Sequence, residues 1–162
     1  DPAMAAQIEL VFFDGEEALV QFTDLEVPLP DGLFGSRHYA LVLRESGRAG
    51  QFKSGVLWDM IGDRDLTITL SPDSPPALAR GILSAADALH LRQHFSFYQR
   101  SILDDHVPLL HFAHIPTIDL IDFDYGPGNK WHHSPDDTID KVSAASLQVV
   151  GDVGMGLSRV EK

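Results

Sequence analysis

The chain has 162 residues, and its 24 acidic residues against 12 basic ones give a formal net charge of −12. This balance argues against nucleic acid and anionic membrane surfaces as partners, whereas an acidic cleft would attract cationic ligands such as free amino termini. With 44% hydrophobic residues, the chain can form a core, and we expect one domain over residues 1–162. Because the chain has no cysteine, any metal must be held by histidine and carboxylate.

Apolar runs and turn residues predict strands that alternate with helices. Residues 1–4 are expected to be an extension left by cloning, with Met4 as the first coded residue. The run 8–14 (IELVFFD) predicts a buried, parallel strand, and 107–112 is left open between strand and loop. We therefore expect a three-layer α/β fold, with a central, mostly parallel (mixed) sheet flanked by helices. The remaining predictions are strands at 55–62, 66–70 and 115–123, helices at 36–46 (with Ser36 as its cap), 71–91 and 143–157, and loops at 22–35 and 124–137.

Two adjacent glutamates, Glu16 and Glu17, follow the first apolar run directly after Asp14 and Gly15. Two carboxylates at the end of a buried strand repel each other and resist desolvation, and a metal ion would compensate them. Because neighbouring side chains of an extended segment point in opposite directions, one glutamate can bind the metal while the other moves protons. The alternative interpretation is an acidic pair at the start of a helix, stabilised by the helix dipole.

Further candidate residues follow the predicted strands, at the edge where open α/β sheets bind ligands. In WHHSPDD (131–137), His132 and His133 offer a metal ligand, with aspartates as its support. Asp59 ends an apolar strand and Asp104 lies in a DDH sequence, and either can be a ligand or a proton acceptor. The alternatives are turn and capping chemistry for the first segment, a capped strand end for Asp59 and a solvated loop for Asp104. We expect Trp58 in the core and Trp131 in the cleft wall. Two histidines, His90 and His94, are expected on the surface, and three are expected to be structural: His38, His111 and His114.

Six segments, in order along nearly the whole chain, resemble a known family: VFFDGEEA, LFGSRHYA, LWDMIG, DDHVPLL, IPTIDLID and HSPDDTIDKV. They are similar to the zinc aminopeptidase and glutaminyl cyclase family of metallopeptidases, family M twenty-eight. The long connection between FFDGEEA and GSRH, together with DDHVPLL, resembles glutaminyl cyclases more than aminopeptidases. The resemblance implies a zinc-dependent, glutaminyl cyclase-like enzyme that acts on peptide N-termini, with a zinc aminopeptidase as the alternative.

The resemblance also implies roles for individual residues. Glu17 and His133 match zinc ligands, and Glu16 matches the general acid/base. Asp59 matches a substrate-contacting acid of cyclases, or a ligand of the second zinc in dinuclear aminopeptidases. Asp104 matches an acid of the cyclase proton network. Substrate-binding positions are expected at Phe22 in an aromatic pocket, at His132 beside the substrate, and at Trp131 in the cleft wall.

The sequence also departs from the family pattern. The family's upstream half, with a metal-binding aspartate and the first strands of the fold, has no counterpart here, so Glu17 and His133 would be two ligands where catalytic zinc usually has three. A third hypothesis is therefore an inactive fragment or interaction domain, which would self-associate through an exposed sheet edge. Family members are often secreted or periplasmic, and this chain shows no signal peptide.

Overall fold

The computed structural model describes residues 2–19 and 31–160. The helices are α1 (Pro2–Ala5), α2 (Phe34–Glu45), α3 (Pro76–Ala88), α4 (His106–His111) and α5 (Ala144–Val160). The strands are β1 (Gly55–Asp59), β2 (Ile68–Leu70), β3 (Phe95–Phe97) and β4 (Thr117–Ile121), and single turns of 3-10 helix cover Ala49–Gln51, Arg92–His94 and Ile139–Lys141. Within these residues, no helix has the length and apolar character needed to cross a membrane.

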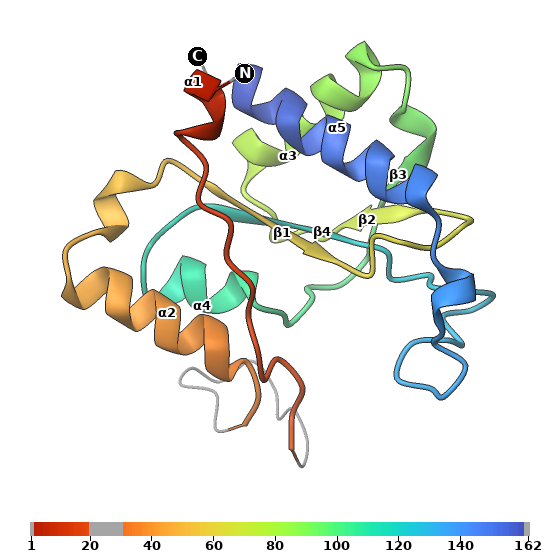
Figure 1. Cartoon of the computed structure of the whole chain (residues 1–162), viewed down its shortest axis with the longest axis horizontal. Coiled ribbons are helices and arrows are strands. Elements are labelled where there is room, and N and C mark those ends of the chain that lie inside the picture. Colours follow the sequence, from red (N-terminus) through yellow and green to blue (C-terminus); the bar gives the residue numbers. More distant parts are fainter. Residues whose placement is uncertain (1, 20–30, 161–162) are drawn as a thin grey trace.

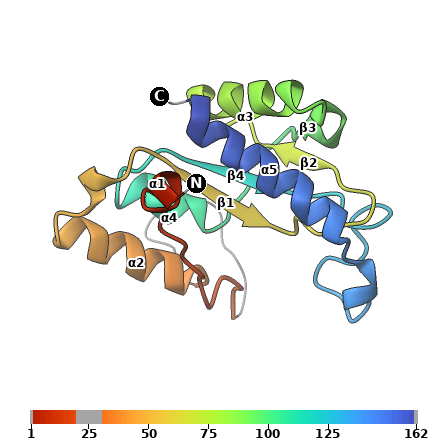
Figure 2. The same ribbon diagram turned by 45° about the horizontal axis from the view of Figure 1, so that its top comes forward.

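The strands form one mixed sheet in the order β1-β4-β2-β3. β4 runs parallel to β1 and antiparallel to β2, while β2 and β3 are parallel. Helices α3 and α5 cover one face of the sheet, and α2 and α4 lie on the other (Figures 1 and 2). The expected three-layer α/β fold is therefore confirmed.

The core lies on both sides of β4, whose five residues are all buried. Ile118 and Leu120 belong to the larger apolar cluster, which α3 and α5 complete with residues such as Ile82 and Val153. A smaller cluster joins α2 to α4 and includes Leu43, Ala40, Leu109 and Ile115. Because neighbouring side chains of a strand point to opposite faces, Asp119 faces the α4 side. A carboxyl group is therefore buried in the layer that leads toward the ends of β1 and β4.

The prediction of a buried strand at 8–14 is wrong. These residues form no ladder with the described strands, and Phe12 is 91% exposed. Phe13 packs on Tyr39 with ring centroids 5.8 Å apart, and Glu9 accepts a hydrogen bond from Tyr39 and pairs with Arg48. An apolar run becomes a strand only where a neighbouring strand can satisfy its backbone groups, and the pattern alone cannot supply that partner.

Two helix predictions also need correction. α2 begins two residues earlier than expected, and Ser36 is not its cap, because its hydroxyl donates to the carbonyl of Leu33 within the first turn. Residues 107–112, expected to be a strand or a loop, lie almost entirely within α4, where Pro108 occupies the first turn that tolerates proline.

The strand predictions need correction at two further places. The predicted strand 55–62 stops at Asp59, because Met60 adopts a left-handed conformation with φ 49°. Trp58, expected in the core, is 43% exposed, because it lies on the edge strand β1, with its ring beside Gly154 of α5. The short strand β3 was not predicted.

Candidate active site

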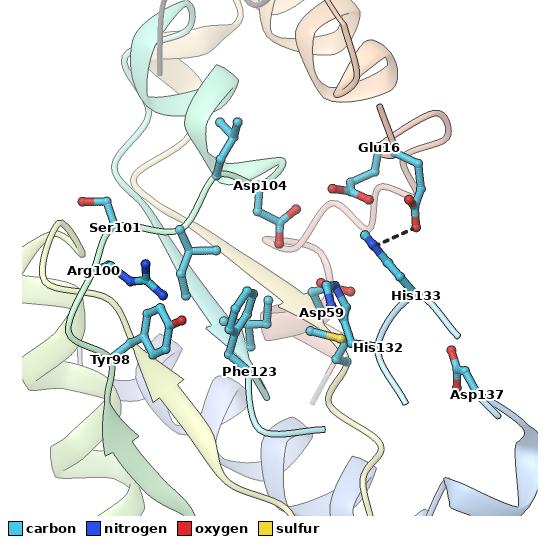
Figure 3. Close-up of a pocket in the computed structure, with 15 residues that line it drawn as sticks. Glu16, Asp59, Tyr98, Arg100, Ser101, Asp104, Phe123, His132, His133 and Asp137 are labelled. Atoms are coloured by element: carbon cyan, nitrogen blue, oxygen red, sulfur yellow. Dashed lines mark ion pairs between the residues drawn. The ribbon is translucent and has the colours of Figure 1, made fainter. Parts of the chain in front are cut away.

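A pocket of about 510 Å³ lies at the carboxyl ends of β1 and β4. Because these two strands are parallel and adjacent, the segments that follow them meet at one edge of the sheet. The loop between β3 and α4 forms another wall (Figure 3). The lining residues are Glu16, Glu17, Asp59, Met60, Tyr98, Arg100, Ser101, Ile102, Leu103, Asp104, Ile121, Phe123, His132, His133 and Asp137.

Glu17 and His133 meet at this pocket. Oε1 of Glu17 lies 3.1 Å from Nε2 of His133, the ion pair drawn in Figure 3. The start of α2 holds the glutamate segment in place, because the amide of Leu33 donates to the carbonyl of Glu16 at 2.8 Å and the amide of Phe34 donates to that of Gly15 at 2.9 Å. The segment therefore reaches the pocket without forming a strand.

The histidine loop brings a small aromatic wall to the pocket. His132 stacks on His133 with centroids 3.8 Å apart and lies 5.7 Å from the ring of Phe123, which in turn lies 5.0 Å from Tyr98. His133 has a φ of 52°, in the left-handed region that costs about 1–3 kcal/mol for residues with a side chain. Strained residues of this kind cluster at functional sites, and Met60 beside Asp59 is a second example in the same pocket.

The pocket is strongly acidic. Burial, together with the charges of Asp59 and Glu17, raises the pKa of Glu16 to about 7. Burial and the charge of Asp59 raise the pKa of Asp104 to about 8, and burial also raises the pKa of Asp59. Arg100 is the only lysine or arginine among the described lining residues. This arrangement favours a cationic ligand, and it includes Glu16, a carboxyl group that can gain or lose a proton near neutral pH.

The donor types present suit zinc, although their number is incomplete. Glu17 and His133 offer one carboxylate oxygen and one imidazole nitrogen at the pocket surface. Over residues 2–19 and 31–160, no three His, Asp or Glu side chains are arranged to hold a metal. The pair would therefore supply two of the three protein ligands usual for catalytic zinc.

Most of the residues singled out from the sequence lie together in the pocket: Glu16, Glu17, Asp59, Asp104, His132 and His133. Trp131 is not among the lining residues, because its ring packs on Gly126 and on Tyr125, 5.5 Å away. Phe22 lies outside the described residues. Several of the lining residues were not predicted from the sequence. Phe123 could have been found as the last residue of the predicted strand 115–123, whereas Tyr98, Arg100 and Ser101 follow a strand of only three residues and carry no such signal.

A mixed α/β sheet with carboxylates and imidazoles gathered at its carboxyl edge is the arrangement of a ligand-binding or active site in an open α/β fold. The model of Peptidase family M28 matches residues 2–157, and the chain belongs to this family. No curated protein gives a significant match.

Solved structures of the same fold include glutaminyl cyclases and an aminopeptidase. The glutaminyl cyclase of an Acidobacteriales bacterium is 35% identical with a TM-score of 0.82, over 92% of this chain and 50% of that one. The Fimbriiglobus ruber glutaminyl cyclase is 27% identical with a TM-score of 0.76, and the match covers 93% of this chain and 51% of that one. A leucine aminopeptidase precursor from Bacteroides thetaiotaomicron shares the fold at 22% identity and a TM-score of 0.76, and the match covers 93% of this chain and 52% of that one. The chain thus spans about half the length of these proteins.

Proposed function

We propose that the pocket is a zinc-dependent, glutaminyl cyclase-like site that acts on the N-terminal glutamine of peptides. The observation that carries this proposal is the position of Glu16, a carboxyl group with a pKa of about 7, next to the Glu17–His133 pair. The glutaminyl cyclase that is 35% identical over 92% of the chain supports the same reaction.

In this reaction, the α-amine of the substrate forms a bond to the carbonyl carbon of its own side-chain amide, and ammonia leaves. Glu16 accepts a proton from the attacking amine and returns it to the departing nitrogen. Asp59 and the other pocket carboxylates attract the amino terminus, and Asp104, with a pKa of about 8, is protonated at neutral pH and can donate a hydrogen bond. Zinc held by Glu17 and His133, with a further ligand from Asp59 or another polypeptide, would polarise the amide carbonyl.

The test is ammonia release from a peptide with N-terminal glutamine, with and without added zinc. We expect a pyroglutamyl peptide as the product, and no reaction from the same peptide with an acetylated N-terminus, because the attacking amine is then blocked. Loss of ammonia release in Glu16→Gln, with zinc content unchanged, would support the proton-transfer role.

An aminopeptidase is the second candidate, supported by membership of a peptidase family. It would use Glu16 as the base for a water molecule that attacks the first peptide bond. Release of free amino acids from ordinary peptides, with no pyroglutamyl product, would favour this activity. If zinc binds at much less than one equivalent and neither product forms, the chain acts as an inactive or interaction domain, and the proposal of cyclase activity is contradicted.

A further inference from the structure

A buried aspartate and a buried histidine lie behind the pocket, on the face of the sheet that α4 covers. Asp119, in the middle of β4, is 1% exposed, and His106, the first residue of α4, is 3% exposed. Oδ2 of Asp119 lies 3.7 Å from Nδ1 of His106, slightly too far for a direct hydrogen bond. Within the described part of the chain, these two atoms and Oδ1 of Asp119 have no hydrogen-bond partner.

The chemistry of the two groups makes them complementary. A buried carboxyl without partners is unfavourable on a central strand, where an apolar side chain would pack without this cost. Burial raises the pKa of Asp119 well above its usual range, and burial lowers the pKa of His106 to about 4. The His106 ring is therefore neutral near pH 7, and burial favours the protonated form of Asp119. A protonated carboxyl is a donor and an unprotonated Nδ1 is an acceptor, so a small movement would join them.

The pair is connected to the pocket through the turn that precedes α4. His106 follows Asp104 and Asp105 directly, and the amide of Asp105 donates to Oδ1 of Asp104 at 2.5 Å. The amide of Val107 donates to the carbonyl of Asp104 at 2.9 Å. Figure 3 shows Asp104 pointing into the pocket, toward Glu16 and Asp59. An anchor at His106 therefore fixes the turn that presents Asp104.

We propose that Asp119 and His106 are positioning residues: the carboxyl of Asp119 donates to Nδ1 of His106 and holds the turn that presents Asp104 to the pocket. The importance of Asp104 for turnover rests on the proposed function, whereas the anchor itself does not. The charged and titratable groups that act on the pair are Asp59 on β1, Asp73 after β2, Asp104 and Asp105 before α4, and His111 at its end.

Two substitutions separate this role from simple filling of space. Asp119→Asn keeps a donor that can reach Nδ1, whereas Asp119→Leu has a similar size and no donor. We expect Asp119→Asn to retain the NMR signals of the His106 ring and of the Asp105 amide. We expect Asp119→Leu to shift both signals and to speed exchange of the Asp105 amide by at least about tenfold. Asp122→Asn is the matched control, because Asp122 is buried at the end of β4 but accepts the amides of Thr67 and Asp124 instead.

The outcomes distinguish this proposal from the proposed function. The proposal is overturned if Asp119→Leu leaves the signals of His106 and Asp105 unchanged. If Asp119→Leu does not fold, the protonation state of the His106 ring in the wild type tests the proposal. An unprotonated Nδ1 at neutral pH supports the anchor, and a protonated Nδ1 overturns it. With an active enzyme, we expect Asp119→Leu to lower kcat more than it changes KM, with rescue in Asp119→Asn. Absence of cyclase activity in the wild type would contradict the proposed function and leave the NMR test of the anchor intact.

Discussion

Nε2 of His133 lies 3.1 Å from Oε1 of Glu17, so segments from the two ends of the chain meet at one pocket. The side chains are 53% and 67% exposed, and exposed ion pairs contribute little to stability. The left-handed backbone at His133 is itself unfavourable. The fold therefore gains little from this contact, and a ligand that the two side chains share explains it better.

Removing either side chain of this pair should weaken zinc binding. We expect Glu17→Gln and His133→Ala each to reduce the affinity by at least about tenfold, because a site with two donors would lose half of its protein ligands. Competition with a chromophoric chelator measures the change. His38→Ala is the control, since His38 is exposed on α2 and does not line the pocket. Equal zinc affinity in the wild type and His133→Ala would exclude this pair as the metal site.

Glu16 should control the pH dependence of turnover. Its pKa of about 7 means that the carboxylate form, which can accept a proton, decreases as the pH falls below that value. We expect kcat/KM to fall on the acidic side of about pH 7. Glu16→Gln should lower kcat by about 10²–10⁴-fold, whereas Glu45→Gln, on the exposed surface of α2, should not. A variant without Glu16 that kept the wild-type rate and pH profile would rule out this role.

The sequence predicted the parts of the fold that local patterns determine. The periodic apolar residues of α3 and α5 and the β-branched run of β4 form elements close to the expected ones. The run 8–14 shows the limit of this approach, because its apolar residues do not reveal which neighbour would satisfy its backbone. α4 shows another limit, since an apolar run of six residues is compatible with a helix or with a strand.

The candidate site could be anticipated where its residues lie at strand ends. Asp59 directly ends β1, and His132 and His133 lie in the loop after β4, so parallel pairing brings them to one edge. The anchor of Asp119 and His106 could not be anticipated, because it depends on how α4 packs against the sheet. Tyr98 also requires the tertiary structure, since its loop returns to the pocket from a short strand.

The buried acids should make the fold less stable as the pH rises. Asp104 has a folded-state pKa of about 8 against 3.8 for the free side chain, so the folded state holds its proton more tightly. Its contribution to stability is complete below the unfolded pKa and is lost as the pH rises toward about 8. We expect the free energy of unfolding to fall between about pH 6.5 and 8. His106 has little effect over this range, because its pKa is about 4 in the folded state and 6.5 for the free side chain.

Asp104→Asn should reduce this dependence and should be more stable than the wild type at pH 8 by more than about 1 kcal/mol. Urea unfolding at both pH values measures the difference. Asp152→Asn is the control, because Asp152 is exposed on α5. A wild type that became more stable over this range, or a slope unchanged in Asp104→Asn, would contradict the burial of an ionisable Asp104.

Two glycines in the loop after β4 allow the packing of Trp131 to be tested separately from backbone conformation. Gly126 and Gly128 both have a φ of 68°, so alanine at either position should cost about 1–2 kcal/mol in backbone strain. A Cβ at Gly126 would also collide with the ring of Trp131, whereas one at Gly128 meets nothing within 4 Å. We expect Gly126→Ala to lower the free energy of unfolding by about 1–3 kcal/mol more than Gly128→Ala in urea. Because Trp131 directly precedes the two histidines of the pocket, Gly126→Ala should also weaken zinc binding. Equal losses of stability in the two variants would show that Trp131 does not hold this loop in place.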